Sequence, residues 1–284
     1  MKKIVYLLIL CGFVLAGCGK NPPAGETQVL INLSTGPMIN TDTKSATEDM
    51  ISKLILYGVD DKNAVVKIFP VIPNPSLTGI PLTVPVEVKT LYAIANPAPE
   101  IESATPSNVS DLLNLTGNFA AAPQSPFIMG GSGTISGSSA NIVLLRAVAK
   151  VEIIEENEFE IESVTVKNTP NKGYVFKKES TTPPSSSARI DYPAKTANST
   201  VYIAENSKNN PTEFAITGKY LDKQVNYTIV IKKDGSPIDL ARNTCYKVFI
   251  SASPDLECTV TISITEWDEV DADEHIIPDE VFEP

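Results

Sequence analysis

The chain has 284 residues, a formal net charge of −11 and a single histidine, His275. So acidic a chain repels phosphate groups, which argues against nucleic acid as a partner and against polybasic contact with a membrane. One histidine leaves no His/Cys cluster with the spacing of metal ligands, and the chain has neither a G-x-S-x-G nucleophile motif nor a phosphate-binding loop. We therefore expect no cofactor, no metal and no enzymatic activity.

The first eighteen residues have the pattern of a lipoprotein export signal. Lys2 and Lys3 precede an apolar run over 4–16, and the run ends in Leu15-Ala16-Gly17-Cys18. A run of about 13 residues is too short for a membrane span, which needs about 20. The small residues followed directly by a cysteine resemble the lipobox of lipoprotein signal peptidase. We expect residues 1–17 to be removed, which lowers the net charge to about −13, and Cys18 to carry the lipid.

The rest of the chain has the alternating apolar pattern of β-strands, separated by Pro, Gly, Asn and Asp. This spacing is typical of β-sandwiches and predicts an all-β protein. The expected strands lie at 28–33, 52–57, 65–69, 82–95, 142–154, 161–167, 200–204, 213–221, 225–231, 245–251 and 258–265. Only 107–115 is predicted as a helix, with Ser107 or Asn108 as its cap.

Composition also suggests where the chain divides. The Gly/Ser-rich stretch 130–139 and the Ser/Thr/Pro-rich stretch 179–188 are predicted as loops. Because a long strand follows the first of them, we place an N-terminal domain at 18–145 and a C-terminal domain at 146–284. The acidic tail 266–284 contains nine acids and neither Lys nor Arg, and its apolar residues are too irregular to predict a strand.

Cys245 and Cys258 lie on two strands that we expect to form a hairpin. Matching the apolar faces of these strands places Cys258 opposite Ile250, while Cys245 points to the other face and lies farther along. A disulfide needs Cα atoms within about 7 Å. We therefore predict two free, half-buried thiols.

Several segments together resemble the fimbrillins, the lipoprotein-derived pilins (type V pili) of anaerobic Gram-negative bacteria. These segments, in chain order behind the lipobox, are Leu91-Tyr92-Ala93-Ile94-Ala95-Asn96, Phe127-Ile128-Met129-Gly130-Gly131, Leu145-Arg146-Ala147-Val148-Ala149-Lys150-Val151, Tyr202-Ile203-Ala204-Glu205-Asn206-Ser207, Ala241-Arg242-Asn243-Thr244-Cys245-Tyr246 and Trp267. We interpret them as residues that maintain the fold and not as a functional site.

The resemblance implies two tandem transthyretin-like Greek-key sandwiches and a role as a pilus subunit that serves adhesion. In stalk subunits of the family a protease removes the first strand, here 27–34, and a strand of another pilin subunit fills the groove. Val29, Ile31 and Leu33 would line that groove. The family's usual cut follows an arginine, but the only basic residue between Lys20 and Lys53 is Lys44. We therefore expect cleavage between Lys44 and Ser45.

The resemblance also implies partners and a place in the cell. The expected partners are other pilin subunits, the outer membrane through the lipid on Cys18 before processing, and a host or bacterial surface receptor. The alternative to a polymerising subunit is a surface lipoprotein or tip adhesin that binds glycan or host protein without polymerising. A hydrolase with scattered carboxylates, as in glycosidases, has no support in the pattern.

Overall fold

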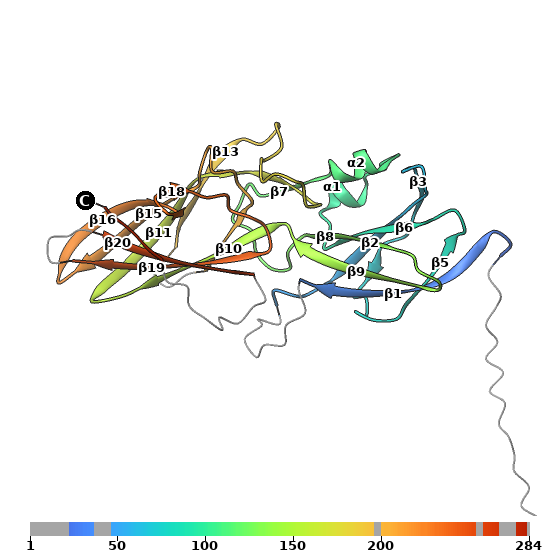
Figure 1. The fold of residues 1–284 in the computed structure, drawn as a ribbon, viewed down its shortest axis with the longest axis horizontal. Helices are drawn as coiled ribbons and strands as arrows, with labels where there is room; N and C mark the ends of the chain where they lie inside the picture. Colours follow the sequence, from blue (N-terminus) through green and yellow to red (C-terminus); the bar gives the residue numbers. More distant parts are fainter. Residues whose placement is uncertain (1–22, 37–46, 196–199, 254–257, 267–276, 283–284) are drawn as a thin grey trace, which may run out of the picture.

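Strands form most of the chain, and they assemble into two β-sandwiches that lie end to end along the molecule (Figure 1). The computed structural model describes residues 23–36, 47–195, 200–253, 258–266 and 277–282. The expected all-β fold of two tandem sandwiches is confirmed. Within these ranges no helix has the length and apolar character needed to cross a membrane.

The first sandwich is built from one continuous ladder of strands in the order β3-β2-β6-β8-β9-β1-β5, with β4 paired to β2. The ladder folds into two layers because β8 and β9 pair only at Met129–Arg146 and Gly130–Leu145. The strands are β1 Glu26–Thr35, β2 Lys53–Val59, β3 Val65–Ile68, β4 Ile72–Pro73, β5 Ile80–Pro85, β6 Thr90–Ala95, β8 Met129–Thr134 and β9 Ser139–Arg146.

The second sandwich has two separate sheets, in the orders β14-β10-β19-β20-β21 and β13-β11-β15-β16. Their strands are β10 Val148–Glu155, β11 Phe159–Pro170, β13 Arg189–Lys195, β14 Thr200–Ala204, β15 Glu213–Tyr220, β16 Lys223–Val230, β19 Thr244–Ala252, β20 Cys258–Glu266 and β21 Ile277–Phe282.

The two sandwiches share one connectivity. In the first, β1 pairs in parallel with β9 and antiparallel with β5. In the second, β10 pairs in parallel with β19 and antiparallel with β14. The opposite layers match as well, since β2 lies between β3 and β6 as β11 lies between β13 and β15. Strand β10 is therefore the counterpart of β1.

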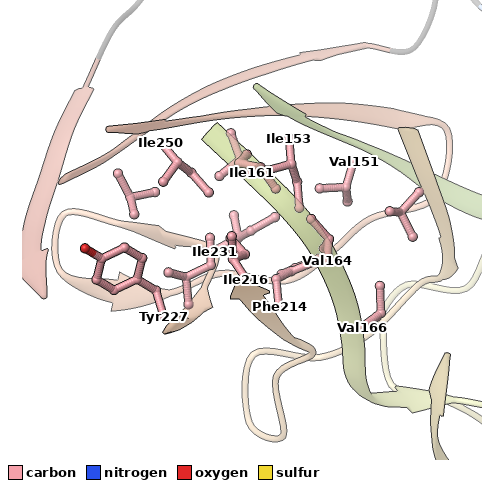
Figure 2. Close-up of a cluster of buried hydrophobic side chains, with 14 of the residues drawn as sticks. Val151, Ile153, Ile161, Val164, Val166, Phe214, Ile216, Tyr227, Ile231 and Ile250 are labelled. Carbon is pink, nitrogen blue, oxygen red and sulfur yellow. The ribbon is translucent and has the colours of Figure 1, made fainter. Parts of the chain in front are cut away.

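Each sandwich encloses its own apolar core. Inward-facing residues of both sheets meet in the second sandwich, where Val151 and Ile153 face Phe214 and Ile216 (Figure 2). The core of the first sandwich combines side chains of both layers, including Ile31 of β1. Burial of such side chains is the main favourable contribution to folding.

Two long predicted strands are each divided in the structure. The run 82–95 forms β5 and β6, because Pro85 ends the first and the chain turns at Val86, whose side chain is 53% exposed. The run 142–154 forms β9 and β10, because Ala147 leaves the ladder and its N–H donates to the carbonyl of Ile128. The prediction of single strands was wrong because apolar alternation continues through both breaks and hides them in the sequence.

The Gly/Ser-rich stretch predicted as a loop contains strand β8. A Cβ atom on Gly131 would lie 2.0 Å from the carbonyl oxygen of Val143, and one on Gly133 would lie 2.2 Å from that of Asn141. Glycine is therefore required here by the close approach of β9, and it does not mark a flexible segment. The other predicted loop, 179–188, contains no strand.

Two short helices and two small ladders complete the fold. Helix α2 (Val109–Leu113) confirms the predicted helix, and the Asn108 side chain caps it by accepting from the N–H of Asp111. Helix α1 (Pro99–Glu102) was missed because it is one turn long. The ladders pair β7 with β12 and β17 with β18; these strands are β7 Thr116–Asn118, β12 Lys172–Tyr174, β17 Lys232–Lys233 and β18 Ser236–Pro237.

The C-terminal hairpin differs from the prediction in register. Cys258 lies opposite Ala252 and not opposite Ile250, although it faces the same side of the sheet. Neither Cys245 nor Cys258 forms a disulfide, and both are buried, not half-buried, because the sheet face that each one joins is covered. The tail also supplies a strand that was not predicted, since β21 pairs with β20.

Candidate functional site

Strand β1 occupies a central position in its layer, between β5 on one side and β9 on the other. It pairs antiparallel with β5 from Glu26–Pro85 to Ile31–Ile80 and in parallel with β9 from Leu30–Ser139 to Thr35–Leu144. The first half of β1 is thus bonded on one edge, to β5, and the second half on the other edge, to β9. Taking this strand away would expose two strand edges and the core between them.

The three residues singled out in the sequence all point into that core. Val29 and Ile31 are fully buried and Leu33 is 5% exposed, whereas Leu30 between them is 49% exposed. They join a cluster that includes Leu54 and Leu56 on the opposite layer. At about 1.5–3 kcal/mol for each buried aliphatic side chain, their burial contributes roughly 5–9 kcal/mol.

A polar contact fixes the register of β1. The amide of Asn32 donates to Oδ1 of Asn141 on β9 at 3.0 Å, and its own Oδ1 accepts from the N–H of Gly79 at 3.0 Å. The side chain of Asn32 therefore makes one hydrogen bond on each side of β1, to β9 and to the residue directly before β5. A one-residue slip would break both bonds and turn the apolar side chains outward.

The outer edge of this layer is closed to further strands. Strand β5 is the edge strand, and it carries Pro81 and Pro85, neither of which has an N–H. A proline cannot donate to β1, so its nitrogen lies on the outer edge of the sheet, where it discourages pairing with another chain. Within this layer, β1 lies on the inner side of β5, between β5 and β9.

A second cluster of polar residues lies where the two sandwiches meet. Arg146 at the end of β9 is fully buried, and its Nη1 donates to Oδ1 of Asn243, which precedes β19 of the second sandwich, at 2.9 Å. Its Nη2 pairs with the carboxylate of Asp49, and its Nε donates to the carbonyl of Glu48 at 3.4 Å. A buried guanidinium requires such partners, and it receives them from both sandwiches.

Glu48 connects the segment before β2 to the second sandwich. Its carboxylate accepts from the hydroxyl of Tyr202 on β14 at 2.5 Å and lies 3.4 Å from the Nζ of Lys150 on β10. Burial, and in addition the bond to Glu48, raises the pKa of the Tyr202 hydroxyl. Burial alone would lower the pKa of Lys150, but Glu152 and Glu48 outweigh it and raise that pKa.

A buried ion pair lies nearby. Arg242 donates to Glu205 through Nε at 2.9 Å and through Nη2 at 2.5 Å, and its Nη1 donates to the carbonyl of Val175 at 2.8 Å. Val175 and its neighbour Phe176 pack against the outer face of the first sandwich. There the rings of Phe176 and Tyr92 form an edge-to-face pair with their centroids 5.5 Å apart. The ion pair thus holds a segment that bridges the two sandwiches.

Three polar residues of the family-like motifs, Arg146, Arg242 and Asn243, therefore lie at this junction, which agrees with a role in maintaining the fold. Two of their partners, Glu48 and Asp49, were missed. An acidic partner for Arg146 could have been expected, since a buried arginine needs a carboxylate. The sequence does not show which acid lies near, because Glu48 and Arg146 are 98 positions apart.

Other predicted site residues lie outside the described ranges. Cys18, Lys44 and Ser45 belong to this group. The single histidine, His275, and Trp267 of the family-like pattern also lie outside these ranges. Within the described part of the chain, no group of three or more His, Cys, Asp or Glu side chains is placed to hold a metal ion.

Solved structures of fimbrial proteins share this arrangement of two sandwiches. One is the tip fimbrial protein Mfa3 of Porphyromonas gingivalis with a C-terminal truncation, at 16% identity and a TM-score of 0.62, covering 85% of this chain and 100% of that chain. Another is a fimbrial assembly protein of Parabacteroides distasonis, at 14% identity and a TM-score of 0.62, covering 90% and 99%. At such identities the likeness concerns the fold alone.

The sequence itself defines the family. The profile of the fimbrillin-A associated anchor proteins Mfa1 and Mfa2 matches residues 125–273, which is more than half of the chain. The chain belongs to this family. No curated protein sequence matches it.

Proposed function

We propose that this protein is a structural subunit of a cell-surface pilus, exported as a lipoprotein and assembled by strand exchange after β1 has been removed. The observation that carries the proposal is the position of β1. It is bonded on both edges, it buries Val29, Ile31 and Leu33, and only the segment 37–46 links it to the rest of the chain.

The cut that would release β1 lies between Lys44 and Ser45 in this proposal. The vacated groove would then take a strand from another subunit by β-augmentation, in which main-chain bonds supply affinity and alternate side chains supply specificity. The incoming strand needs aliphatic residues at three alternate positions to replace Val29, Ile31 and Leu33. Because an open sheet edge promotes aggregation, exposing it only at assembly protects the precursor.

Lipid on Cys18 places the precursor at the outer membrane. Two or three acyl chains, at about 0.8 kcal/mol per buried methylene, anchor a protein stably. If Lys44 is cut, the lipid leaves together with β1 and serves transport only. The pilus then presents the subunit at the cell surface, where it serves adhesion to a host or bacterial receptor.

A second role within the same pilus is an uncleaved anchor that keeps Cys18. Two observations favour it: the family is named for anchor proteins, and no arginine precedes Arg146. The acidic tail is also a poor strand donor by composition, since β21 contains Pro278, Asp279 and Glu280. An anchor would accept a strand or retain its own without donating one.

Electron microscopy of the purified chain tests the proposal, before and after limited trypsin treatment. The expected result is filaments after cleavage only, and none from a Lys44→Gln variant treated in the same way. Filaments from uncut protein, or none from protein cut at Lys44, would contradict strand exchange. Deletion of 268–284 then distinguishes two roles. If the tail is the donor strand, the deletion abolishes filaments; if the subunit only accepts a strand, filaments still form.

A further inference from the structure

The segment between the expected cut and β2 is held by side chains from both sandwiches. Glu48 bonds Tyr202 of β14 at 2.5 Å and lies 3.4 Å from Lys150 of β10. Asp49 pairs with Arg146 of β9. Within two residues the chain thus contacts three strands, two of which belong to the second sandwich.

The next residues of the segment are held through their backbone. The side-chain amide of Asn96, at the end of β6, donates to the carbonyl of Met50 at 2.8 Å, and its Oδ1 accepts from the N–H of Ser52 at 2.8 Å. The same amide donates to the carbonyl of Phe127 at 2.8 Å. Asn96 adopts φ of +51°, a conformation that asparagine tolerates better than most residues.

Ile51 completes the attachment. It lies between these polar contacts and is 9% exposed in the core of the first sandwich. The residues from 47 to 52 are therefore fixed by a core side chain, a buried arginine, an amide and a tyrosine–carboxylate bond. Such attachment is unusual for a segment that only links two strands, because chain ends and links are usually loosely held.

We propose that residues 47–52 act as a clasp that keeps the chain end created by cleavage fixed on the junction. This proposal rests on the proposed cleavage after Lys44, which makes Ser45, two residues before Thr47, the new terminus. Strand β2 is an inner strand, bonded to β3 and β6. Held by the clasp, β2 stays in its layer when β1 leaves, and the groove remains a formed acceptor.

Substitution of Tyr202 can separate the contribution of the bond to Glu48 from that of ordinary packing. The Tyr202 ring packs on Phe127 with the centroids 4.6 Å apart, and its hydroxyl donates to the carboxylate of Glu48. Tyr202→Phe keeps the ring and removes the bond. Tyr192→Phe is a matched control, since Tyr192 is a buried tyrosine of the second sandwich whose hydroxyl donates to Phe119 and not to the clasp.

The experiment uses the full mature chain with residues 38–44 replaced by the recognition sequence of a site-specific viral protease. Hydrogen–deuterium exchange is measured by mass spectrometry on peptides covering 47–59, before and after the cut. In the parent chain we expect exchange to change less than about twofold on cutting. In the cut Tyr202→Phe chain we expect it to be about tenfold faster, with little change before cutting or in the Tyr192→Phe control.

Two results would overturn the clasp. One is rapid exchange of 47–59 in the cut parent chain, and the other is equal protection in the cut parent and cut Tyr202→Phe chains. Glu48→Ala provides a second variant from the other side of the same bond. The engineered site is cut whether or not Lys44 is the natural cleavage site. The exchange measurement therefore tests the clasp even if the cut protein forms no filaments, a result that would contradict only the proposed function.

Discussion

Two buried tyrosines differ in whether the hydroxyl has a partner. The hydroxyl of Tyr192 donates to the carbonyl of Phe119 at 2.9 Å. That of Tyr57 has no hydrogen-bond partner among the described residues, although its side chain is fully buried. A buried polar group without a partner costs free energy, whereas a satisfied one contributes modestly to stability.

This difference predicts opposite effects of the same substitution. Tyr57→Phe should raise the free energy of unfolding by about 1 kcal/mol, and Tyr192→Phe should lower it by about the same amount. Urea denaturation of both variants measures the change. A loss of stability in Tyr57→Phe would show that the hydroxyl has a partner after all.

The ion pairs also differ in what they contribute. Arg242 and Glu205 are both buried, whereas Lys219 and Glu162 form a 2.7 Å pair in which both side chains are more than 40% exposed. Arg242→Ala should destabilise the protein by about 3–5 kcal/mol because it leaves a buried carboxylate. Lys219→Ala should leave the stability almost unchanged, because solvent screens an exposed pair. Similar losses in thermal unfolding would refute this ranking.

At the scale of elements, β1 and β10 have equivalent places in their sandwiches but differ in how the chain connects them. Strand β10 continues directly from β9 through Ala147, so it is tied to the chain at both ends. Strand β1 precedes every other described strand, and a single segment connects it to the rest. In the proposed assembly, one cut therefore suffices to separate β1 from the other described strands, whereas β10 would need two.

Two neighbouring residues of β1 test its contribution. Ile31→Ala should lower the free energy of unfolding by about 2–5 kcal/mol, because Ile31 is fully buried. Leu30→Ala should change it by less than about 0.5 kcal/mol, because Leu30 points outward. Equal effects in chemical denaturation would mean that the burial pattern of β1 is incorrect.

Sequence patterns predicted strands with regular apolar alternation, as in β19, where buried residues alternate. They missed β13, which has no such run of apolar residues. The patterns failed where tertiary contacts determine whether a segment forms a strand. The close approach of β9 makes Gly131 and Gly133 part of a strand, and Ala147 interrupts an apolar run only because the chain passes between sandwiches. The three site residues of β1 could be found from alternation, but the contacts of Glu48 could not.

For the molecule as a whole, burial of weak acids predicts sensitivity to high pH. Burial raises the pKa of Tyr57, Tyr192, Tyr246 and Cys258 to about 12. The unfolded chain loses these protons at lower pH, near 10 for tyrosine and 9 for cysteine. The stabilisation is therefore fully present below pH 9 and is lost as pH rises towards 12.

Thermal unfolding between pH 8 and pH 12 measures this dependence. The melting temperature should be nearly constant up to about pH 9 and then fall steadily. Tyr246→Phe should reduce the slope, since it removes one of the ionising groups. A melting temperature that is unchanged up to pH 12 would contradict the burial of these groups.

The central claim is that β1 is removed when the protein enters a pilus, and the N-terminus of the protein in filaments sheared from cells tests it most directly. N-terminal sequencing with mass spectrometry should find chains that begin at Ser45 and lack residues 26–35. Chains that begin at a lipid-modified Cys18 throughout the filaments would contradict strand exchange by this subunit.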